Sequence, residues 1–385
     1  MIHRNISQIL EKSASQYPVV TLTGPRQSGK TTLCRSLFAH HAYASLEPLD
    51  MRSYAAEDPR GFLREHADGA IIDEVQNVPE LLSYLQAEVD ERRDPGRFIL
   101  TGSQHFGLSA SISQSLAGRT AVHHLLAPSF DELRRFDNAP SSLLDTLWSG
   151  AYPAIFDRKI EPYRWFADYL ATYVERDVRQ VLKVTDLDSF SKFVRLCAGF
   201  SGQEINLSKL GSAAGVTHPT AKAWLAVLEA SFLCVRLSPW HTNFKKQLVK
   251  APKLHFLDAG LLCHLLGIRT PEQLQHHPLR GAIFESWVVS EVYKARTHAG
   301  LAPDMFHYRA TRGPEVDLVV SGGEHATLVE VKSAETIASD FFSGLNSLSE
   351  ELQGAERRLV YGGSRSYERS GTAVISWSSL HDQPW

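Results

Sequence analysis

The residues most able to do chemistry in this sequence form one octet, Gly24-Pro-Arg-Gln-Ser-Gly-Lys-Thr31. The octet fits the phosphate-binding pattern G-x-x-x-x-G-K-[ST] at every fixed position. An apolar run precedes it and a helical run follows, so N–H groups of the loop and of the helix N-terminus can face phosphates. Lys30 would then reach the β- and γ-phosphates, and the Thr31 hydroxyl would hold Mg²⁺. The sequence therefore predicts a site for ATP and Mg²⁺, with the nucleotide bound by Gly24, Pro25, Arg26, Gln27, Ser28, Gly29, Lys30, Thr31 and Thr32.

Two acids end an apolar strand farther along the chain, at residues 70–74. After a phosphate-binding loop, this arrangement predicts that Asp73 binds in the Mg²⁺ shell and that Glu74 polarises the attacking water. A second apolar strand, residues 98–102, ends in polar residues. Either Ser103 or Gln104 would orient water against the γ-phosphate, and a simple turn is the alternative.

One arginine follows soon after this strand, in the segment Ser115-Leu-Ala-Gly-Arg119. Arg119 is a candidate for stabilising transition-state charge, either within one subunit or across a subunit interface. Arg26, inside the loop, is a second candidate for that role. The alternative is that Arg119 is an ordinary surface arginine.

The second half of the chain contains a helix–turn–helix pattern at residues 207–228, followed by two candidate strands of a wing. Thr217 can cap the second helix, with Pro219 in its first turn. From Ala230 to Leu257 there are basic residues and no acid, which predicts a local surface for a phosphate backbone. The basic residues are Arg236, Lys245, Lys246, Lys250 and Lys253, and the predicted DNA contacts are Thr220, Lys222, Lys245, Lys246 and Lys250. The alternative is a module that contacts only protein.

Acids and one lysine form a further constellation near the C-terminus, with the spacing Asp317-x12-Glu330-x-Lys332. Asp317 and Glu330 could share a divalent cation, with Lys332 beside it and Glu285 as a further ligand. This is the layout of a metal-dependent nuclease core. The alternative is a scaffold of the same shape that does not cut.

The composition of the chain limits how these motifs can be interpreted. The chain has 385 residues, of which 43% are hydrophobic, and a net charge of −3, so a nucleic-acid surface must be local. The sequence shows no membrane span or signal peptide, and its four cysteines are scattered, which predicts a cytoplasmic protein. We expect an α/β chain of four parts: a parallel-sheet P-loop ATPase core (1–135), a helical domain (136–200), a winged helix–turn–helix (201–268) and a nuclease-like α/β domain (269–385).

With these residues in view, the chain resembles a bacterial and archaeal family of AAA-type P-loop ATPases whose C-terminal half has a poorly defined function. The resemblance implies a winged helix and a C-terminal domain similar to PD-(D/E)xK nucleases. By analogy with related ring-forming machines it also implies a homo-oligomer, such as a hexamer. Ala151 stands where a second glycine is expected. The segments that carry the resemblance are Gly24–Thr32, Ile72–Gln76, Leu100–Gln104, Ser115–Arg119, Gly150–Pro153, Tyr173–Asp177, Lys253–Leu261, Gly313–Asp317 and Glu330–Lys332.

These patterns together predict an ATPase that binds and remodels DNA, with branch migration of junctions as the specific hypothesis. Two alternatives remain open from the sequence. One is a nucleotide-controlled switch that binds protein partners. The other is an ATP-gated, metal-dependent nuclease centred on Asp317, Glu330 and Lys332.

Overall fold

The computed structural model divides the chain into two compact units. Unit 1 comprises Met1–Pro128 with Ala230–Phe232 and Thr297–Leu301, and unit 2 comprises the remainder. The four domain boundaries expected from the sequence stay a prediction. No helix in the described part of the chain is long and apolar enough to cross a membrane. The structure describes residues 2–103, 112, 114–173, 186–240, 251–310, 313, 315–322, 325–352 and 354–385.

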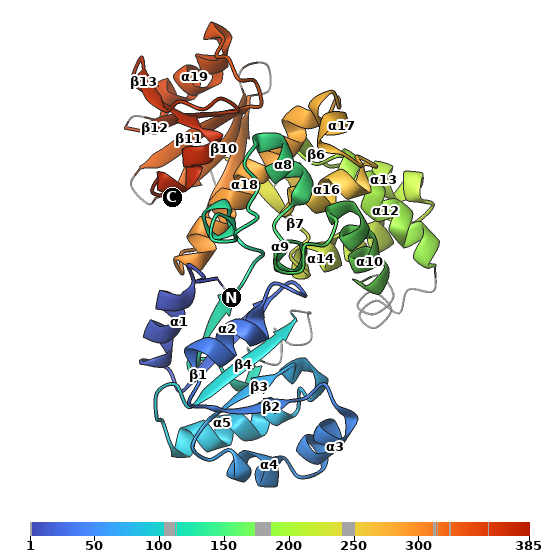
Figure 1. Ribbon diagram of the computed structural model, residues 1–385, viewed down its shortest axis with the longest axis vertical. Coiled ribbons are helices and arrows are strands. Elements are labelled where there is room, and N and C mark those ends of the chain that lie inside the picture. The colour runs from blue at the N-terminus through green and yellow to red at the C-terminus, as the bar shows by residue number, and fades with distance from the viewer. Residues whose placement is uncertain are drawn as a thin grey trace. The chain divides into compact units, whose positions relative to one another are not determined.

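Unit 1 is built on a five-stranded sheet in the order β2-β3-β4-β1-β5 (Figure 1). Every pairing in this sheet is parallel, so the carboxyl ends of all five strands meet at one edge. β4 separates β1, which leads into the predicted phosphate loop, from β3, which ends at the predicted Mg²⁺ ligand. The strands are β1 (Val19–Gly24), β2 (Ala42–Ser45), β3 (Ala70–Asp73), β4 (Phe98–Ser103) and β5 (Thr120–His124).

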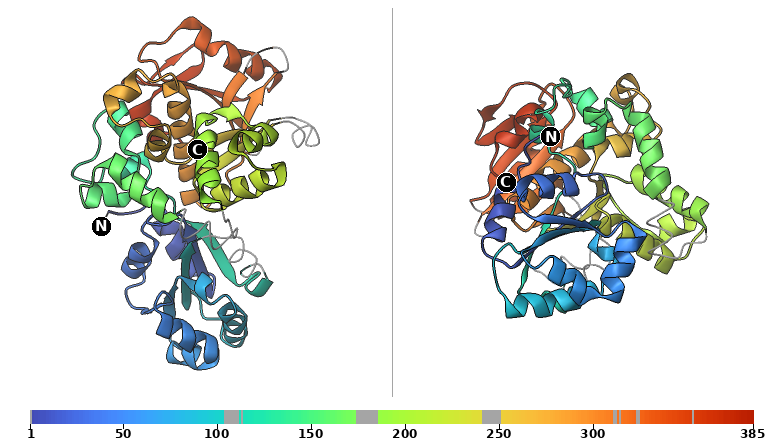
Figure 2. Two further views of the ribbon diagram at one scale, coloured as in Figure 1. Left: turned by 90° about the vertical axis from the view of Figure 1, so that its right-hand side faces the viewer. Right: turned by 60° about the horizontal axis from the view of Figure 1, so that its bottom comes forward.

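Helices cover both faces of this sheet, and the side chains of each strand alternate between two cores. Ile71 and Ile99 belong to a core with α1 (Ser7–Ala14) and α2 (Lys30–Leu37). Their neighbours Ile72 and Leu100 belong to a second core on the opposite face. The helices of that face are α3 (Leu49–Glu57), α4 (Pro59–Glu65) and α5 (Leu81–Glu91), which can be followed in Figures 1 and 2. The expected parallel α/β ATPase-like domain is confirmed.

Unit 2 carries a mixed sheet of nine strands in the order β13-β14-β12-β11-β10-β9-β7-β8-β6. Three pairings, β7 with β9, β11 with β12 and β12 with β14, are parallel, and the others are antiparallel. The strands are β6 (Gln203–Glu204), β7 (Cys234–Pro239), β8 (Lys253–Phe256), β9 (Met305–Arg309), β10 (Glu315–Ser321), β11 (Ala326–Lys332), β12 (Glu356–Tyr361), β13 (Tyr367–Arg369) and β14 (Thr372–Ser376).

The pairing of β7 with β9 joins two segments that the sequence assigns to different domains. Ser238 pairs with Phe306 and Pro239 with His307, and the N–H of Trp240 donates to the carbonyl oxygen of His307 over 2.6 Å. The expected wing and the expected C-terminal domain therefore share one hydrogen-bonded sheet.

Helices form most of the rest of unit 2 (Figure 2). α19 packs on β10, β11 and β12 through a core that includes Val319, Leu328 and Leu345. The helices are α7 (Phe130–Leu133), α8 (Leu143–Ser149), α9 (Pro153–Asp157), α10 (Pro162–Tyr173), α12 (Leu187–Gly199), α13 (Leu207–Ala214), α14 (His218–Ala230), α16 (Ala259–Leu265), α17 (Pro271–Gln275), α18 (Arg280–His298) and α19 (Ser343–Glu351).

Candidate functional site

The predicted phosphate-binding loop lies between the end of β1 and the start of α2, at the carboxyl edge of the unit 1 sheet. Gly24 has a φ of 148°, and a Cβ there would lie 2.2 Å from the carbonyl oxygen of Leu125. Gly29 has a φ of 96°, in the left-handed region that favours glycine. Both fixed glycines of the motif therefore have a steric or conformational reason to be glycine.

A buried arginine, Arg4, contacts the backbone of this loop. The guanidinium of Arg4 donates to the carbonyl oxygens of Ser28, over 2.9 Å, and Leu126, over 2.8 Å. Arg4 precedes the motif by 20 positions, and nothing in the sequence pattern points to it. It ties the loop backbone to the segment that follows β5.

Lys30 is buried at the start of α2, where its ammonium donates to the carbonyl oxygens of Gly24 (3.0 Å) and Pro25 (2.8 Å). The pKa of Lys30 is lowered to about 8, chiefly because the ammonium is buried; the charge of Arg26 also lowers it, while Glu74 and Asp73 act in the opposite direction. A desolvated cation lying along the loop is suited to a phosphate oxyanion.

Two more features of the loop concern its polar groups. The hydroxyl of Ser28 is buried without a hydrogen-bond partner among the described residues. Thr32 is exposed on the first turn of α2. The buried hydroxyl of Ser28 leaves a polar group that a phosphate oxygen would satisfy.

Three hydroxyl groups donate hydrogen bonds to the carboxylate of Asp73, at the carboxyl end of β3. Thr31 Oγ1 lies 3.0 Å from Oδ2 and 3.2 Å from Oδ1 of Asp73, and Tyr43 donates to Oδ2 over 2.8 Å. Thr101, from β4, donates to Oδ1. The structure thus brings together the two residues predicted to hold Mg²⁺. This hydroxyl–carboxylate pair fits a hard divalent cation. Tyr43 and Thr101 were not predicted.

Glu74 follows β3 directly and has a φ of 56°, a left-handed backbone that is unusual for a residue with a side chain. The side-chain amide of Gln76 donates to the Glu74 carboxylate. Such backbone strain costs about 1–3 kcal/mol and gathers at functional sites, which agrees with the predicted role of Glu74 as the base. Gln76 is a neighbour of that carboxylate that the sequence did not single out.

Ser103 and Arg119, the two remaining catalytic candidates, lie at opposite edges of the sheet. The backbone of Ser103 pairs with that of Gly24, beside the loop, but its side chain and all of Gln104 lie outside the described residues. Arg119 precedes β5 at the amino edge of the sheet, because Val19 pairs with Thr120, next to it. Its guanidinium binds both carboxylate oxygens of Asp90 over 2.7 Å each. Within one chain, Arg119 therefore lies at the edge of the sheet opposite the phosphate loop, and action across an interface stays a prediction.

The helix–turn–helix pattern corresponds to α13 and α14. Thr217 caps α14, since its Oγ1 accepts from the N–H of Thr220 over 3.4 Å. Lys222 is exposed, whereas Trp224 and Leu228 are buried, as the pattern predicts. The other predicted DNA contacts, Lys245, Lys246 and Lys250, lie outside the described residues.

Two of the five basic residues of the predicted DNA-binding surface are paired with acids. Arg236 on β7 binds the carboxylate of Glu229 through two nitrogens, over 2.6 and 2.7 Å. Lys253 on β8 is only 3% exposed. The sequence could not show this, since Glu229 comes before the acid-free segment and the partners of Lys253 come from a distant strand and a helix.

Two of those partners, Glu285 and Asp317, are acids predicted to hold a second metal. The ammonium of Lys253 lies 3.3 Å from Glu285 Oε1 and 3.8 Å from Asp317 Oδ1, and it also pairs with Glu315. Lys332 pairs with Glu330 and lies 4.0 Å from Asp317 Oδ2. We call these six residues, Lys253, Glu285, Glu315, Asp317, Glu330 and Lys332, the acid–lysine cluster.

The electrostatics of this cluster follow from burial and from its two ammonium groups. Burial raises the pKa of Glu285 to about 8 and that of Glu330 to about 8, and the charge of Asp317 adds to both shifts. The pKa of Lys253 is raised, because the three carboxylates around it outweigh its own burial. In the described part of the chain, no three His, Cys, Asp or Glu side chains are arranged to hold a metal ion. The arrangement does not fit the second metal site that we expected.

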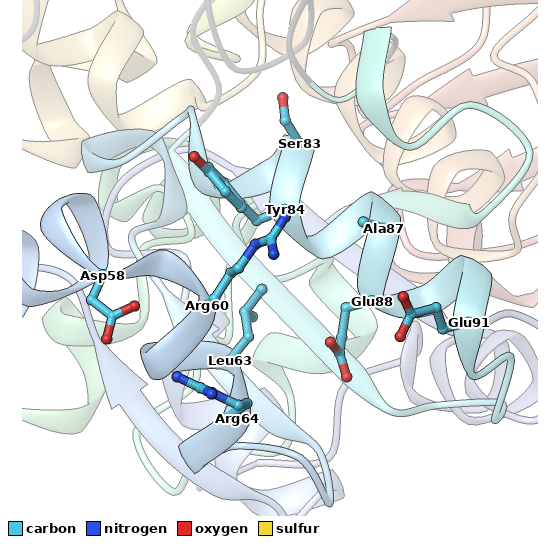
Figure 3. A pocket seen from close by; sticks show the side chains of 9 residues that line it. All are labelled: Asp58, Arg60, Leu63, Arg64, Ser83, Tyr84, Ala87, Glu88 and Glu91. Carbon is cyan, nitrogen blue, oxygen red and sulfur yellow. The ribbon is translucent and has the colours of Figure 1, made fainter.

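A groove of about 600 Å³ lies elsewhere in unit 1, between α4 and α5 (Figure 3). Its Glu88 is bound to Arg97 over 2.6 Å, and none of the predicted site residues lines it. The groove is therefore separate from the phosphate loop. Its charged and aromatic lining includes Asp58, Arg60, Arg64, Tyr84 and Glu88.

Family models match three stretches of the chain. An AAA domain matches residues 16–134, a domain of unknown function (DUF8612) matches residues 141–272, and another domain of unknown function (DUF4143) matches residues 280–380. The AAA match coincides with the parallel sheet and its phosphate-binding loop. Unit 1 thus contains an AAA-type P-loop ATPase domain.

The chain as a whole belongs to the same family as two mycobacterial proteins. The uncharacterized protein Rv2008c of Mycobacterium tuberculosis is 30% identical over 380 residues, which cover 96% of this chain and 82% of that protein. The uncharacterized protein Mb2031c of Mycobacterium bovis matches with the same identity and coverage. The names of these two proteins state no function.

Solved structures overlap this chain only in part. The Walker-type ATPase PabY2304 of Pyrococcus abyssi is 17% identical, with a TM-score of 0.45, and covers 69% of this chain and 96% of its own. A point variant of RuvB from Thermotoga maritima is 18% identical, with a TM-score of 0.30, and covers 61% of this chain and 90% of its own.

Proposed function

We propose that this protein hydrolyses ATP with Mg²⁺ and uses the cycle to bind and remodel DNA. The observation that carries the ATPase half is the convergence of Lys30, Thr31 and Asp73 at the carboxyl edge of one parallel sheet. Lys30 would bind the β- and γ-phosphates, and Thr31 and Asp73 would hold Mg²⁺. Glu74, directly after Asp73, would take the proton of the attacking water.

The DNA half of the proposal depends on α13 and α14 with strands β6, β7 and β8. We interpret them as a winged helix, because α14, with exposed Lys222 and half-buried Thr220, follows a glycine turn and precedes two paired strands. Lys245, Lys246 and Lys250 would add phosphate contacts. Branched DNA, such as a four-way junction, is the proposed substrate, and a homo-oligomer, such as a hexamer, is the proposed assembly.

A specific observation favours a second candidate, a nucleotide-controlled switch that binds a protein partner. Arg236 is bound to Glu229, and Lys253 is buried among acids, so the described part of the expected basic surface is smaller than the sequence suggested. Helix–turn–helix units also serve as protein-binding modules. Slow ATP turnover without stimulation by DNA is the behaviour that this candidate predicts.

The deciding experiment measures the ATPase rate alone and with single-stranded, duplex and four-way-junction DNA, at low and moderate salt. Stimulation by one form that weakens with salt supports the DNA proposal, since phosphate contacts release counterions. A matched chain with Lys222→Ala should lose part of that stimulation and keep the basal rate. Equal rates with and without every DNA would refute DNA remodelling and leave the switch.

A further inference from the structure

Lys253 occupies the point in unit 2 where carboxylates from two elements converge. Glu285 comes from α18, and Glu315 and Asp317 come from β10. All three lie within 4 Å of the Lys253 ammonium, whose side chain is 4% exposed. The ammonium therefore stands where a shared cation would have to bind these carboxylates.

Asp317, the central acid, has both of its carboxylate oxygens engaged. Oδ1 faces Lys253 at 3.8 Å. Oδ2 accepts the backbone N–H of Val331 over 2.8 Å and faces Lys332 at 4.0 Å. A divalent cation needs several oxygen ligands at roughly 2.0–2.6 Å, which the ammonium groups here prevent.

The two ammonium groups of the acid–lysine cluster, those of Lys253 and Lys332, are paired with its four carboxylates. Buried charges are tolerated in proteins when they are paired in this way.

The backbone of Lys253 also fixes it in place. Lys253 lies within β8, where it pairs with Leu237 of β7 on one side and with Glu204 of β6 on the other. Withdrawal of the ammonium by movement of the backbone would break two strand pairings. Two strand pairings therefore fix the backbone position of Lys253.

From this geometry we propose that Lys253 is the resident cation of the acid–lysine cluster, so that the cluster binds no divalent cation and cuts no DNA. Removal of its charge alone should convert Glu285, Glu315 and Asp317 into a site for Mn²⁺ or Mg²⁺, which are hard cations that prefer carboxylate oxygens. This inference concerns unit 2 and does not depend on the proposed function.

The test measures Mn²⁺ binding to the full chain by electron paramagnetic resonance, without nucleotide, in a D73N background that removes the metal ligand of the ATPase site. Five chains are compared: D73N, D73N/D317N, D73N/K253R, D73N/K253Q and D73N/K253Q/D317N. We expect one Mn²⁺ per chain only in D73N/K253Q, with affinity at least about tenfold higher than in the other four. The conservative K253R change is the matched control, because it keeps the charge.

Three results would overturn the inference. One is Mn²⁺ binding by the D73N chain that disappears when D317N is added, because the cluster would then take a metal beside Lys253. Another is a folded D73N/K253Q chain that binds no Mn²⁺. If K253Q prevents folding, the D73N and D73N/D317N chains decide alone. Mn²⁺-dependent DNA cutting by the unaltered chain that D317N abolishes would also refute the proposal.

Discussion

The hydroxyl of Thr31 hydrogen-bonds the carboxylate of Asp73, with Oγ1 3.0 Å from Oδ2. These residues lie 42 positions apart. Thr31 lies on α2, the helix that follows β1, and Asp73 is the last residue of β3. β4 separates β1 from β3 in the sheet, and both strands end at the same edge. The contact between Thr31 and Asp73 therefore follows from the strand order.

Glu74→Gln should preserve ATP binding and lower the hydrolysis rate by about 10²–10⁴-fold, because an amide cannot take a proton from water. Binding of a fluorescent nucleotide and release of phosphate measure the two steps separately. Lys30→Ala, in contrast, should abolish binding itself. Normal hydrolysis by the Glu74→Gln chain would show that Glu74 is not the base.

Gln76→Ala tests whether the amide that contacts Glu74 positions this carboxylate. The change should alter the hydrolysis rate and leave the affinity for nucleotide unchanged, since Gln76 touches Glu74 and is not part of the loop. An unchanged rate would assign Gln76 a purely structural role.

Lys30 makes the stability of the nucleotide-free protein depend on pH. Its pKa of about 8 in the folded chain lies below the ordinary value of 10.5. The unfolded chain therefore binds more protons between these values, and stability rises with pH across that window. The buried charge costs up to about 3 kcal/mol below pH 8. Urea unfolding of Lys30→Met and of the unaltered chain should show an advantage for Lys30→Met that shrinks between pH 7 and pH 9.5; a constant difference would contradict this origin.

Arg4→Lys should lower the stability by about 2 kcal/mol, because a lysine cannot donate to the carbonyl oxygens of both Ser28 and Leu126 in the geometry of the guanidinium. The affinity for ATP should fall as well, since the loop loses its support. Arg64→Lys, at an exposed position of α4, is the matched control and should change neither quantity. Equal behaviour of the two variants would exclude Arg4 as a support of the loop.

Arg119→Ala should change the stability little, as expected for a partly exposed ion pair with Asp90. If Arg119 acts across an interface, the variant loses ATPase activity, and mixing it with Lys30→Ala chains restores part of the rate. In such a mixture each defective chain supplies what the other lacks. Full activity of Arg119→Ala alone would remove the residue from the mechanism.

The sequence was sufficient for the ATPase site because its motifs are local. Gly24, Gly29 and Lys30 lie within one loop, and the pattern of their types alone predicts the strand, the turn and the helix around them. Asp73 could be added because an apolar run ending in acids is also a local signal.

Residues that act through tertiary contacts escaped prediction. Arg4, Tyr43 and Thr101 reach the site from other elements, and their neighbours in the sequence give no hint of it. Lys253 was predicted to lie on the basic surface because of its charge. It is instead buried, and it pairs with Glu285 and with two acids of β10. Arg119 was placed with the nucleotide because it follows β4 closely, but parallel strands return each connection to the amino edge.

The pairing of β7 with β9 has a consequence for attempts to study the C-terminal part by itself. A fragment that begins at residue 269 would retain β9 with one open edge, a template for aggregation. It would also lack Lys253, leaving Asp317 and Glu315 without their main counter-charge. Metal binding or DNA cutting measured on such a fragment would therefore not describe the intact chain, in which Lys253 lies among these carboxylates.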